Sequence, residues 1–438
     1  MARTSFLGDL LTSLTKTRWP LGGGGDRRSM EDMCRALLST AGEVSGLRLS
    51  ATILARYKQM NAEGRLAFFK YLNDELDVDA AQVAGLAQAY SENPSTENFT
   101  ALVRAAEPRR QELFRRLHEM PAATAELVSA RVDLLELLKE HPELKRTDMD
   151  LVHLLRSWFN RGFLRIEQID WHTSATLLEK VVAYEAVHEI HDWDDLRRRL
   201  HPTDRRCFAF FHPAMPDEPL IFVEVALTKG VPNSIQGLLA EDREALAAEE
   251  ANTAVFYSIS NCQKGLKGIS FGNFLIKQVV AELSQELPGL NTFVTLSPIP
   301  GLNRWLETLD GDPRAERLLA GKASDTEAMA LAARYLLEAR RPDGFPRDPV
   351  ARFHLGNGAI VHDVHAGADT SANGMAQSSG VMVNYLYDLG QTEKNHEAFT
   401  ADKKIASSRG VRAKSRAEKA APAAPATPLP APAEADAK

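Results

Sequence analysis

A serine held among prolines and a histidine beside a turn are the side chains in this sequence best suited to chemistry. Ser297 lies in the segment 296–301, where prolines at 298 and 300 fix the backbone and can pre-organise the hydroxyl against a ligand. His354 precedes an Asn-Gly turn at 357–358, and an imidazole that titrates near working pH can both donate and accept a proton. A turn serine and a structural histidine are the ordinary alternatives. Because the sequence has no GxSxG motif, an esterase-type nucleophile is not supported.

A segment rich in glycine and lysine at 263–273 is the best candidate for binding an anion. It lies between a predicted strand and a predicted helix, where free backbone N–H groups and the positive helix end attract negative charge. Gly268 and Gly272 bracket the turn and allow close approach of a ligand, while Lys264 and Lys267 can reach phosphates. The segment lacks the GxxxxGK[ST] and GxGxxG patterns, so it suits a pyrophosphate such as that of coenzyme A. An ordinary glycine-rich turn is the alternative.

The remaining histidines and the cysteines do not form a convincing metal site. In a strand over 359–365, His362 and His365 would point to opposite faces, whereas a metal requires converging ligands. His188 and His191 do not follow the HExxH pattern, and the three cysteines are widely spaced without a CxxC motif. We therefore expect no metal and no other cofactor.

Composition sets broad limits on what the chain does. With 438 residues, of which 44% are hydrophobic, it is long enough for two or three folded domains. A net charge of −7 argues against a general nucleic-acid-binding surface. No apolar run reaches the length of a membrane span and the first residues do not resemble a secretory signal, so we expect no membrane partner. The absence of a disulfide framework favours a reducing compartment, and we expect a cytoplasmic protein.

Four regions follow from the pattern along the chain. Residues 1–28, which contain a run of four glycines, are expected to be flexible, and the Ala/Pro-rich residues 411–438 to be a disordered tail. Residues 29–158 show only helical periodicity and predict a bundle that serves oligomerisation rather than chemistry. Residues 159–410 contain β-branched and aromatic runs around one helix, typical of a mixed sheet. The expected fold class is α + α/β, a helix bundle followed by a mixed β-sheet domain with flanking helices.

Taken together, several strings resemble the malonyl-CoA decarboxylase family. They run in the family's order through most of residues 160–390, which is more specific than any single motif. The helical N-terminal part is similar only in its general pattern. The strings are YEAVH at 184–188, EPL at 218–220, VALT at 225–228, FYSIS at 256–260, LSPIPG at 296–301, FHL at 353–355, NGA at 357–359, and SG at 379–380 with Met382, Asn384 and Tyr385.

The resemblance implies an acetyltransferase-like (GNAT) catalytic fold in which the coenzyme A pyrophosphate binds before the central helix. It places the family's serine at Ser297 and its histidine at His354. Animal members carry an acidic residue where this chain has Ser270, which leaves that position without an assigned catalytic role. The chain also ends without the Ser-Lys-Leu address of animal forms. The implied coenzyme-binding residues are Lys267, Gly268, Ile269, Ser270, Phe271, Gly272 and Asn273.

The resemblance implies conversion of malonyl-CoA to acetyl-CoA and CO2 through a thioester enolate, a reaction in which the substrate is its own electron sink. His354 is then the natural proton donor and Ser297 a hydrogen-bond partner of the carboxylate or enolate, although the roles could be reversed. Tyr385 is a phenol donor or, more simply, a core aromatic. A GNAT-type N-acyltransferase and a non-catalytic acyl-CoA-binding regulator are the alternative functions. The bundle predicts a homo-oligomer, either a dimer or a dimer of dimers.

Overall fold

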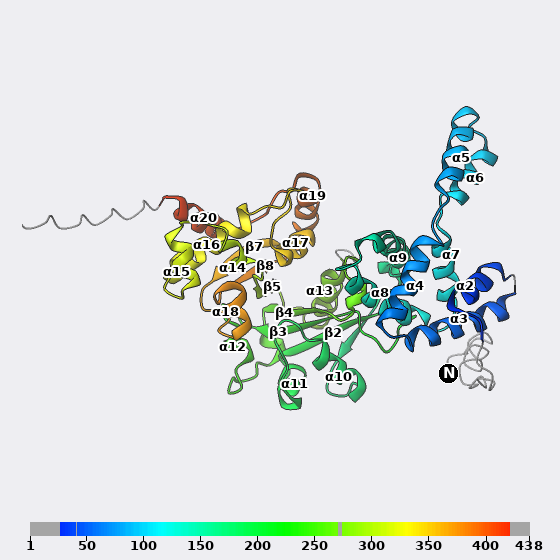
Figure 1. Ribbon diagram of the computed structural model, residues 1–438. Helices are drawn as coiled ribbons and strands as arrows, with labels where there is room; N and C mark the ends of the chain where they lie inside the picture. The colour runs from blue at the N-terminus through cyan, green and yellow to red at the C-terminus, as the bar shows by residue number, and fades with distance from the viewer. Residues whose placement is uncertain (1–26, 41, 270–273, 421–438) are drawn as a thin grey trace, which may run out of the picture.

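The computed structural model describes residues 27–40, 42–269 and 274–420 (Figure 1). Most of the predicted flexible N-terminus and the residues 421–438 of the predicted tail therefore lie outside the described residues. Within the described residues, no helix is long and apolar enough to cross a membrane.

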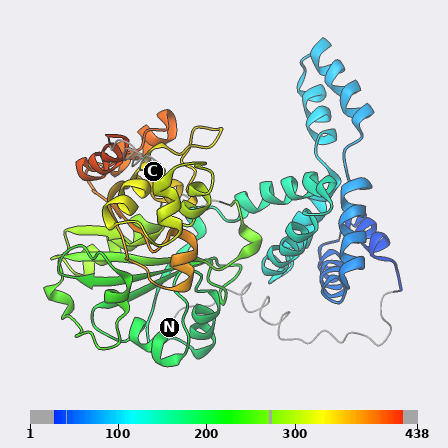
Figure 2. The same ribbon diagram turned by 60° about the vertical axis from the view of Figure 1, so that its left-hand side comes forward.

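The N-terminal part of the chain is entirely helical, as predicted. Side-chain caps start several of these helices: Asn61, Asp79 and Ser95 each accept a hydrogen bond from a backbone N–H of the first turn. Helices α5 and α6 form a hairpin that projects from the remaining helices (Figures 1 and 2), and neither helix has a buried residue. The described helices are α2 (Met30–Ser39), α3 (Glu43–Lys58), α4 (Ala62–Asp74), α5 (Ala80–Glu92), α6 (Thr96–Ala105), α7 (Arg109–His118), α8 (Ala123–Leu137), η1 (Pro142–Leu144) and α9 (Lys145–Trp158).

A mixed sheet forms the centre of the second part. Its order is β1-β2-β3-β4-β5-β8-β6, and β7 pairs with β8. The first four strands are antiparallel, β4 and β5 are parallel, and β8 runs antiparallel to β5, β6 and β7. The register of β4 with β5 ends at Thr295, and the next strand, β6, pairs with β8. The strands are β1 (Arg165–Ile169), β2 (Arg205–Phe211), β3 (Ile221–Thr228), β4 (Thr253–Asn261), β5 (Thr292–Thr295), β6 (Ser297–Pro298), β7 (Ile360–His365) and β8 (Met382–Leu386).

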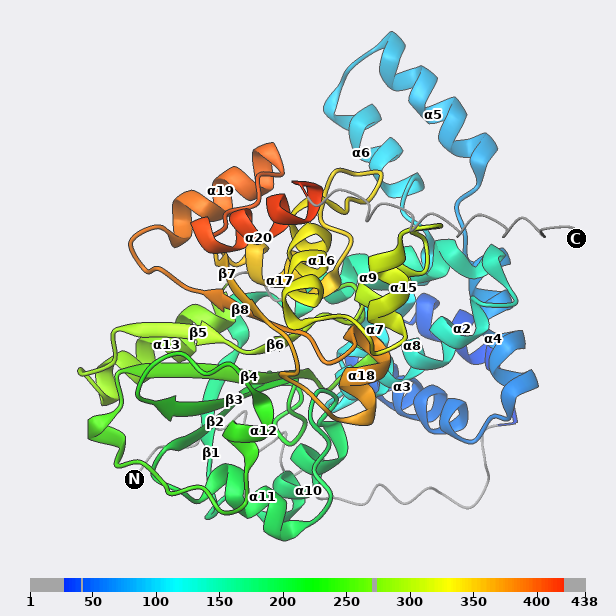
Figure 3. The same ribbon diagram turned by 90° about the vertical axis from the view of Figure 1, so that its left-hand side faces the viewer.

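Helices cover both faces of this sheet, which explains why its strands are apolar on both sides. Helices α10 and α11 pack on one face and α13 on the other, and the C-terminal helices gather over β7 and β8 (Figure 3). The predicted fold class, a helical part followed by a mixed sheet with flanking helices, is confirmed. The helices are η2 (Arg161–Phe163), α10 (Ala175–Tyr184), α11 (Trp193–Leu200), α12 (Ile235–Leu239), η3 (Ala248–Glu250), η4 (Lys264–Leu266), α13 (Phe274–Glu286), α14 (Leu302–Leu306), α15 (Pro313–Leu319), α16 (Asp325–Glu338), α17 (Pro349–Gly356), α18 (Ala372–Ser378), α19 (Thr392–Asp402) and α20 (Arg409–Ala420).

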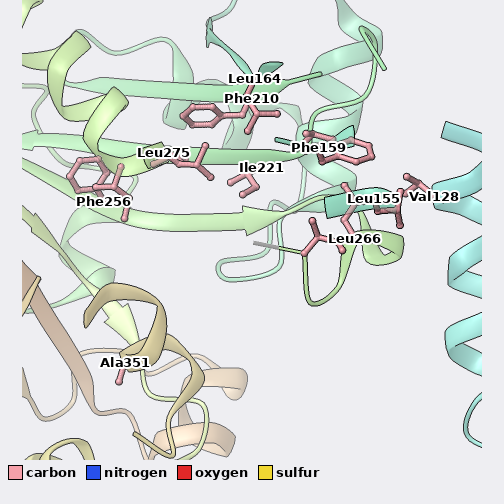
Figure 4. Close-up of a cluster of buried hydrophobic side chains, with 14 of the residues drawn as sticks. Val128, Leu155, Phe159, Leu164, Phe210, Ile221, Phe256, Leu266, Leu275 and Ala351 are labelled. Carbon is pink, nitrogen blue, oxygen red and sulfur yellow. The ribbon is translucent and has the colours of Figure 1, made fainter. Parts of the chain in front are cut away.

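One hydrophobic core spans the predicted boundary between the two parts. The same cluster contains residues of the N-terminal helices, of the sheet and of α13. Figure 4 shows Val128 of α8 and Leu155 of α9 beside Leu266 of η4. The bundle is therefore packed directly against the segment that leads into α13.

The predicted start of the disordered tail at residue 411 is wrong. Helix α20 begins at Arg409 and packs against α16 and β7. Val411 is fully buried, and the Ser415 hydroxyl donates to Glu338 Oε1 at 3.1 Å. Alanine, lysine and arginine are strong helix formers, and Val411 and Ser415 lie four residues apart on one helix face. Low-complexity composition concealed this short amphipathic helix.

Candidate active site

Ser297 and His354 lie in direct contact although 57 residues separate them in the sequence. Ser297 starts β6, and His354 lies in the last turn of α17. The Ser297 Oγ and the His354 Nε2 are 3.3 Å apart, and both side chains are buried, with 5% and 3% of their surface exposed. The two strongest candidates from the sequence thus form one site.

Asp348 connects the two chain segments that carry this pair. Its Oδ1 caps α17 by accepting hydrogen bonds from the backbone N–H groups of Val350 and Ala351, each at 2.9 Å. Its Oδ2 accepts a hydrogen bond from the Gly301 N–H at 3.4 Å, at the end of the proline-rich segment. Burial raises the pKa of Asp348 to about 6, the largest effect, while the backbone hydrogen bonds oppose it. One buried carboxyl therefore fixes both the helix of His354 and the loop after Ser297.

A chain of hydrogen bonds extends from the pair in both directions. The Tyr387 hydroxyl lies 2.8 Å from His354 Nδ1. On the other side, the Ser297 hydroxyl donates to Thr295 Oγ1 at 2.8 Å, and Thr295 Oγ1 also accepts from the Tyr385 backbone N–H at 3.1 Å. Sequence reasoning missed Tyr387 and Thr295. Each lies two residues from a candidate already named, a period that places side chains on one face of an extended chain.

The directions of these bonds are set by the donors available. Because the Ser297 hydroxyl donates to Thr295, its oxygen can accept a hydrogen bond from the N–H at His354 Nε2. His354 Nδ1 is then the acceptor for the Tyr387 hydroxyl. This arrangement selects the His354 tautomer that carries its proton on Nε2, facing Ser297.

Burial lowers the pKa of His354 to about 3, so the imidazole is neutral at physiological pH. The expectation that this histidine titrates near working pH is therefore wrong for the free protein. Among the described residues, no charged side chain compensates for the loss of water around the ring, since burial is the cause of the shift. A neutral His354 can hold one proton at Nε2, but it becomes a cation only when a negative charge enters the site.

Tyr385 supports the ring of His354 without a hydrogen bond from its hydroxyl. The two rings stack with centroids 4.6 Å apart and an angle of 22° between their planes. The Tyr385 hydroxyl is buried and has no hydrogen-bond partner among the described residues. Of the two alternatives for this residue, the contacts favour the core aromatic.

The glycine-rich segment lies where the sequence predicted, between β4 and α13, but only part of it is described. Residues 264–266 form η4, and Ser270, Phe271, Gly272 and Asn273 lie outside the described residues. Lys264 and Lys267 are exposed, and their charges add to that of Lys139, the main cause, in lowering the pKa of Glu136 on α8. Gly268 has φ +81°, a conformation that glycine adopts readily, and a Cβ there would meet nothing within 4 Å. The positive φ of the turn therefore favours glycine at this position. The next residue, Ile269, is buried.

The histidines of β7 are not arranged around a common point. The pairing register of β7 with β8 shifts between Val361 and Asp363, which places His362 in a bulge, and His365 Nε2 contacts Asn384 Oδ1. Among the described residues, no group of three or more His, Cys, Asp or Glu side chains could hold a metal ion.

Comparison with known proteins places the chain in one family. Residues 162–330 and 309–424 match the family described as "Malonyl-CoA decarboxylase C-terminal domain", and residues 76–159 match "Malonyl-CoA decarboxylase N-terminal domain". The mitochondrial malonyl-CoA decarboxylase of Anser anser anser is 35% identical over 417 residues, which cover 83% of this chain and 82% of that protein. The mitochondrial malonyl-CoA decarboxylase of Rattus norvegicus is 36% identical over 345 residues, covering 69% of this chain and 70% of that protein.

Solved structures agree with these matches. The crystal structure of malonyl-CoA decarboxylase from Rhodopseudomonas palustris is 50% identical, with a TM-score of 0.84 over 88% of this chain and 98% of that chain. The one from Agrobacterium vitis is 48% identical, with a TM-score of 0.82 over 88% of this chain and 99% of that chain. On sequence and structure together, this chain belongs to the malonyl-CoA decarboxylase family.

Proposed function

We propose that the chain converts malonyl-CoA to acetyl-CoA and CO2 at the site formed by Ser297 and His354. Family membership supplies the reaction. The observation that carries the assignment of the site is the buried contact between Ser297 Oγ and His354 Nε2, with Tyr387 behind the imidazole. Such an arrangement holds a hydroxyl and an N–H together in a place shielded from water, where polar contacts are strongest.

The chemistry requires orientation and one proton. The bond from C2 to the carboxylate carbon breaks, its electron pair moves into the thioester to give an enolate, and CO2 leaves. A proton then joins C2 to complete acetyl-CoA. The substrate is its own electron sink, so we propose that the reaction needs no cofactor besides the coenzyme A of the substrate. The protein has to align the breaking bond, stabilise the enolate oxygen and deliver the proton.

The low pKa of His354 suggests how the proton arrives. A malonyl carboxylate next to His354 favours the imidazolium, so the ring takes a proton from solvent at Nδ1 when substrate binds. The Tyr387 hydroxyl oxygen then accepts the hydrogen bond from this N–H. When the carboxylate leaves as neutral CO2, the buried imidazolium becomes a strong acid and gives its proton to C2, directly or through Ser297. Stopped-flow mixing with a pH indicator tests this step: proton uptake is expected to accompany binding, and uptake only after CO2 release would contradict it.

Incubation with malonyl-CoA alone tests the proposed reaction. A decarboxylase produces CO2 and acetyl-CoA in equal amounts without an acceptor. A GNAT-type N-acyltransferase would leave malonyl-CoA intact until an amine is added. A non-catalytic acyl-CoA-binding regulator would bind the thioester without consuming it, and removing the His354 imidazole would have no effect on it.

We further propose that the loop around Lys264, Lys267 and Gly268 binds the coenzyme A phosphates. Its support is the pair of exposed lysines just before α13, whose N-terminus adds the positive end of a helix dipole. Phosphate binding at such a position requires close approach to the backbone, which a glycine turn permits.

A homo-oligomer, either a dimer or a dimer of dimers, is proposed as the assembled state. Its support is the α5–α6 hairpin, which has no buried residue and leaves Phe99 and Val103 each 51% exposed. We place the second copy of the chain on this hairpin. A monomer by light scattering at micromolar concentration would contradict this. A cytoplasmic location and a role in fatty acid metabolism, without nucleic-acid or membrane partners, complete the proposal.

A further inference from the structure

Arg131, on helix α8 of the N-terminal part, reaches across to the backbone of the coenzyme A loop. Its Nη1 donates to the Gly265 carbonyl oxygen at 2.6 Å and to the Lys267 carbonyl oxygen at 2.9 Å. Its Nε donates to Asp148 Oδ1 of α9 at 2.9 Å. Both partners of this ion pair are buried, with 3% of Arg131 and 1% of Asp148 exposed. A guanidinium therefore joins two helices of the bundle to two carbonyls of one short loop.

The contact between α8 and this loop has no spare room. A Cβ on Gly265 would lie 1.9 Å from the Val128 carbonyl oxygen, so the loop backbone rests directly on the backbone of α8. Leu266 fills the adjacent space beside Val128 and Leu155 (Figure 4). The loop is thus seated on the bundle by backbone contact, by apolar packing and by the two hydrogen bonds of Arg131.

The position of the Arg131 contacts is informative because they fall on the backbone at or next to the two lysines. Gly265 follows Lys264 directly, and the second carbonyl belongs to Lys267 itself. Both lysine side chains remain exposed while their backbone is fixed. Nη1 alone donates to both carbonyl oxygens, while Nε of the same planar guanidinium is held by Asp148. A lysine ammonium lacks this planar arrangement of donors and does not reproduce all three bonds in the same geometry.

We propose that Arg131 is a positioning residue for coenzyme A binding, and that the N-terminal helices thereby form part of the machinery of the site. Arg131 does not touch the substrate; it holds the loop that presents Lys264, Lys267 and Gly268. This inference rests on the proposed coenzyme A site. The competing explanation is a brace between the two parts of the chain that contributes only to stability.

A second buried arginine in the same bundle provides a matched control. Arg110 is 2% exposed, pairs with Asp150 and Asp77, and donates to the carbonyl oxygens of Leu72 and Asn73, all within the N-terminal part. Arg110→Lys disturbs a buried ion pair of similar kind without touching the loop. Comparison of the two variants separates loop positioning from general loss of stability.

The experiment measures four quantities for the full-length wild type, Arg131→Lys and Arg110→Lys: the free energy of unfolding, kcat, KM for malonyl-CoA, and Kd for free coenzyme A. Arg131→Lys is expected to raise KM and Kd by about tenfold or more, which corresponds to about 1.4 kcal/mol, with kcat within about twofold of wild type. Both substitutions are expected to lower the free energy of unfolding by similar amounts, but Arg110→Lys should leave KM and Kd unchanged.

Unchanged KM and Kd in folded Arg131→Lys would overturn the proposal, and so would an equal rise in both variants. If Arg131→Lys does not fold, Asp148→Asn replaces it, because the amide keeps an acceptor for Arg131 but weakens its anchorage. A rise of about threefold in KM is then expected, and no rise would overturn the proposal. Alanine substitution of Lys264 and Lys267 tests the underlying site separately: if it leaves the Kd for coenzyme A unchanged, the proposed coenzyme A loop fails, whatever Arg131 does.

Discussion

Removal of the Tyr387 hydroxyl tests whether the histidine of the site acts as the structure indicates. In Tyr387→Phe the ring remains, but the donor to His354 Nδ1 at 2.8 Å is lost. The buried Nδ1 then has no partner, and the tautomer that carries its proton on Nε2, facing Ser297, is no longer favoured. We expect turnover to fall while binding of malonyl-CoA is retained.

The magnitude follows from the cost of an unsatisfied buried group. Leaving such a group without its hydrogen bond costs about 1–3 kcal/mol. If that cost falls on the transition state, with about 1.36 kcal/mol for each factor of ten, kcat decreases by about 5-fold to about 160-fold. The substitution is not expected to change how tightly malonyl-CoA binds before it reacts, so KM should change by less than about twofold.

Tyr385→Phe is the matched control. It removes the same atom from a neighbouring tyrosine that also contacts the His354 ring, but this hydroxyl has no hydrogen-bond partner among the described residues. Acetyl-CoA formation is followed at saturating malonyl-CoA for both variants, and thermal unfolding confirms that each is folded. Turnover of Tyr387→Phe within about twofold of wild type, or an equal loss in Tyr385→Phe, would refute the reasoning.

Two further predictions concern the loop and the sheet interior. The double substitution of Lys264 and Lys267 by alanine should raise KM for malonyl-CoA by about tenfold with little change in kcat, and titration with free coenzyme A checks this; unchanged affinity would assign the loop to structure alone. Burial raises the pKa of Glu224, on β3, to about 8 from an ordinary value of 4.5, while Arg199 opposes the shift. Between pH 4.5 and about pH 8, Glu224 is protonated in the folded protein but ionised in the unfolded chain. The free energy of unfolding therefore falls as pH rises, by at most about 1.4 kcal/mol per pH unit. Glu224→Gln removes this dependence, so its stability relative to wild type should increase from pH 5 to pH 8 in urea unfolding; a constant difference would contradict the assignment.

The sequence pattern was sufficient to predict a helical part followed by a mixed-sheet part, and it singled out the two side chains that the fold brings into contact. β-branched and aromatic runs indicated the mixed sheet, and the prolines around Ser297 and the turn after His354 identified two residues that the fold brings together. These signals are local. They depend on the backbone preferences of neighbouring residues and need no knowledge of distant contacts.

What the sequence could not show depends on contacts between distant segments. The pKa of His354 is set by the depth of its burial, which no window of sequence reports. Arg131 contacts the loop from more than 130 residues away, and its own helix gives no sign of that role. Helix α20 was missed because alanine-rich, charged sequence is compatible with both a helix and a disordered tail, and burial of Val411 against its neighbours decides between them.

Comparison of Ser297→Ala, His354→Ala and the double variant tests the central claim most directly. Each variant is first shown to be folded and to bind coenzyme A, and acetyl-CoA and CO2 are then measured from malonyl-CoA alone. We predict that each single substitution lowers kcat by at least about 100-fold, the usual scale for one general acid or oxyanion donor. If the two side chains act as a unit, the double variant should be little worse than the slower single variant. Turnover near that of the wild type in either folded single variant would contradict the proposed site.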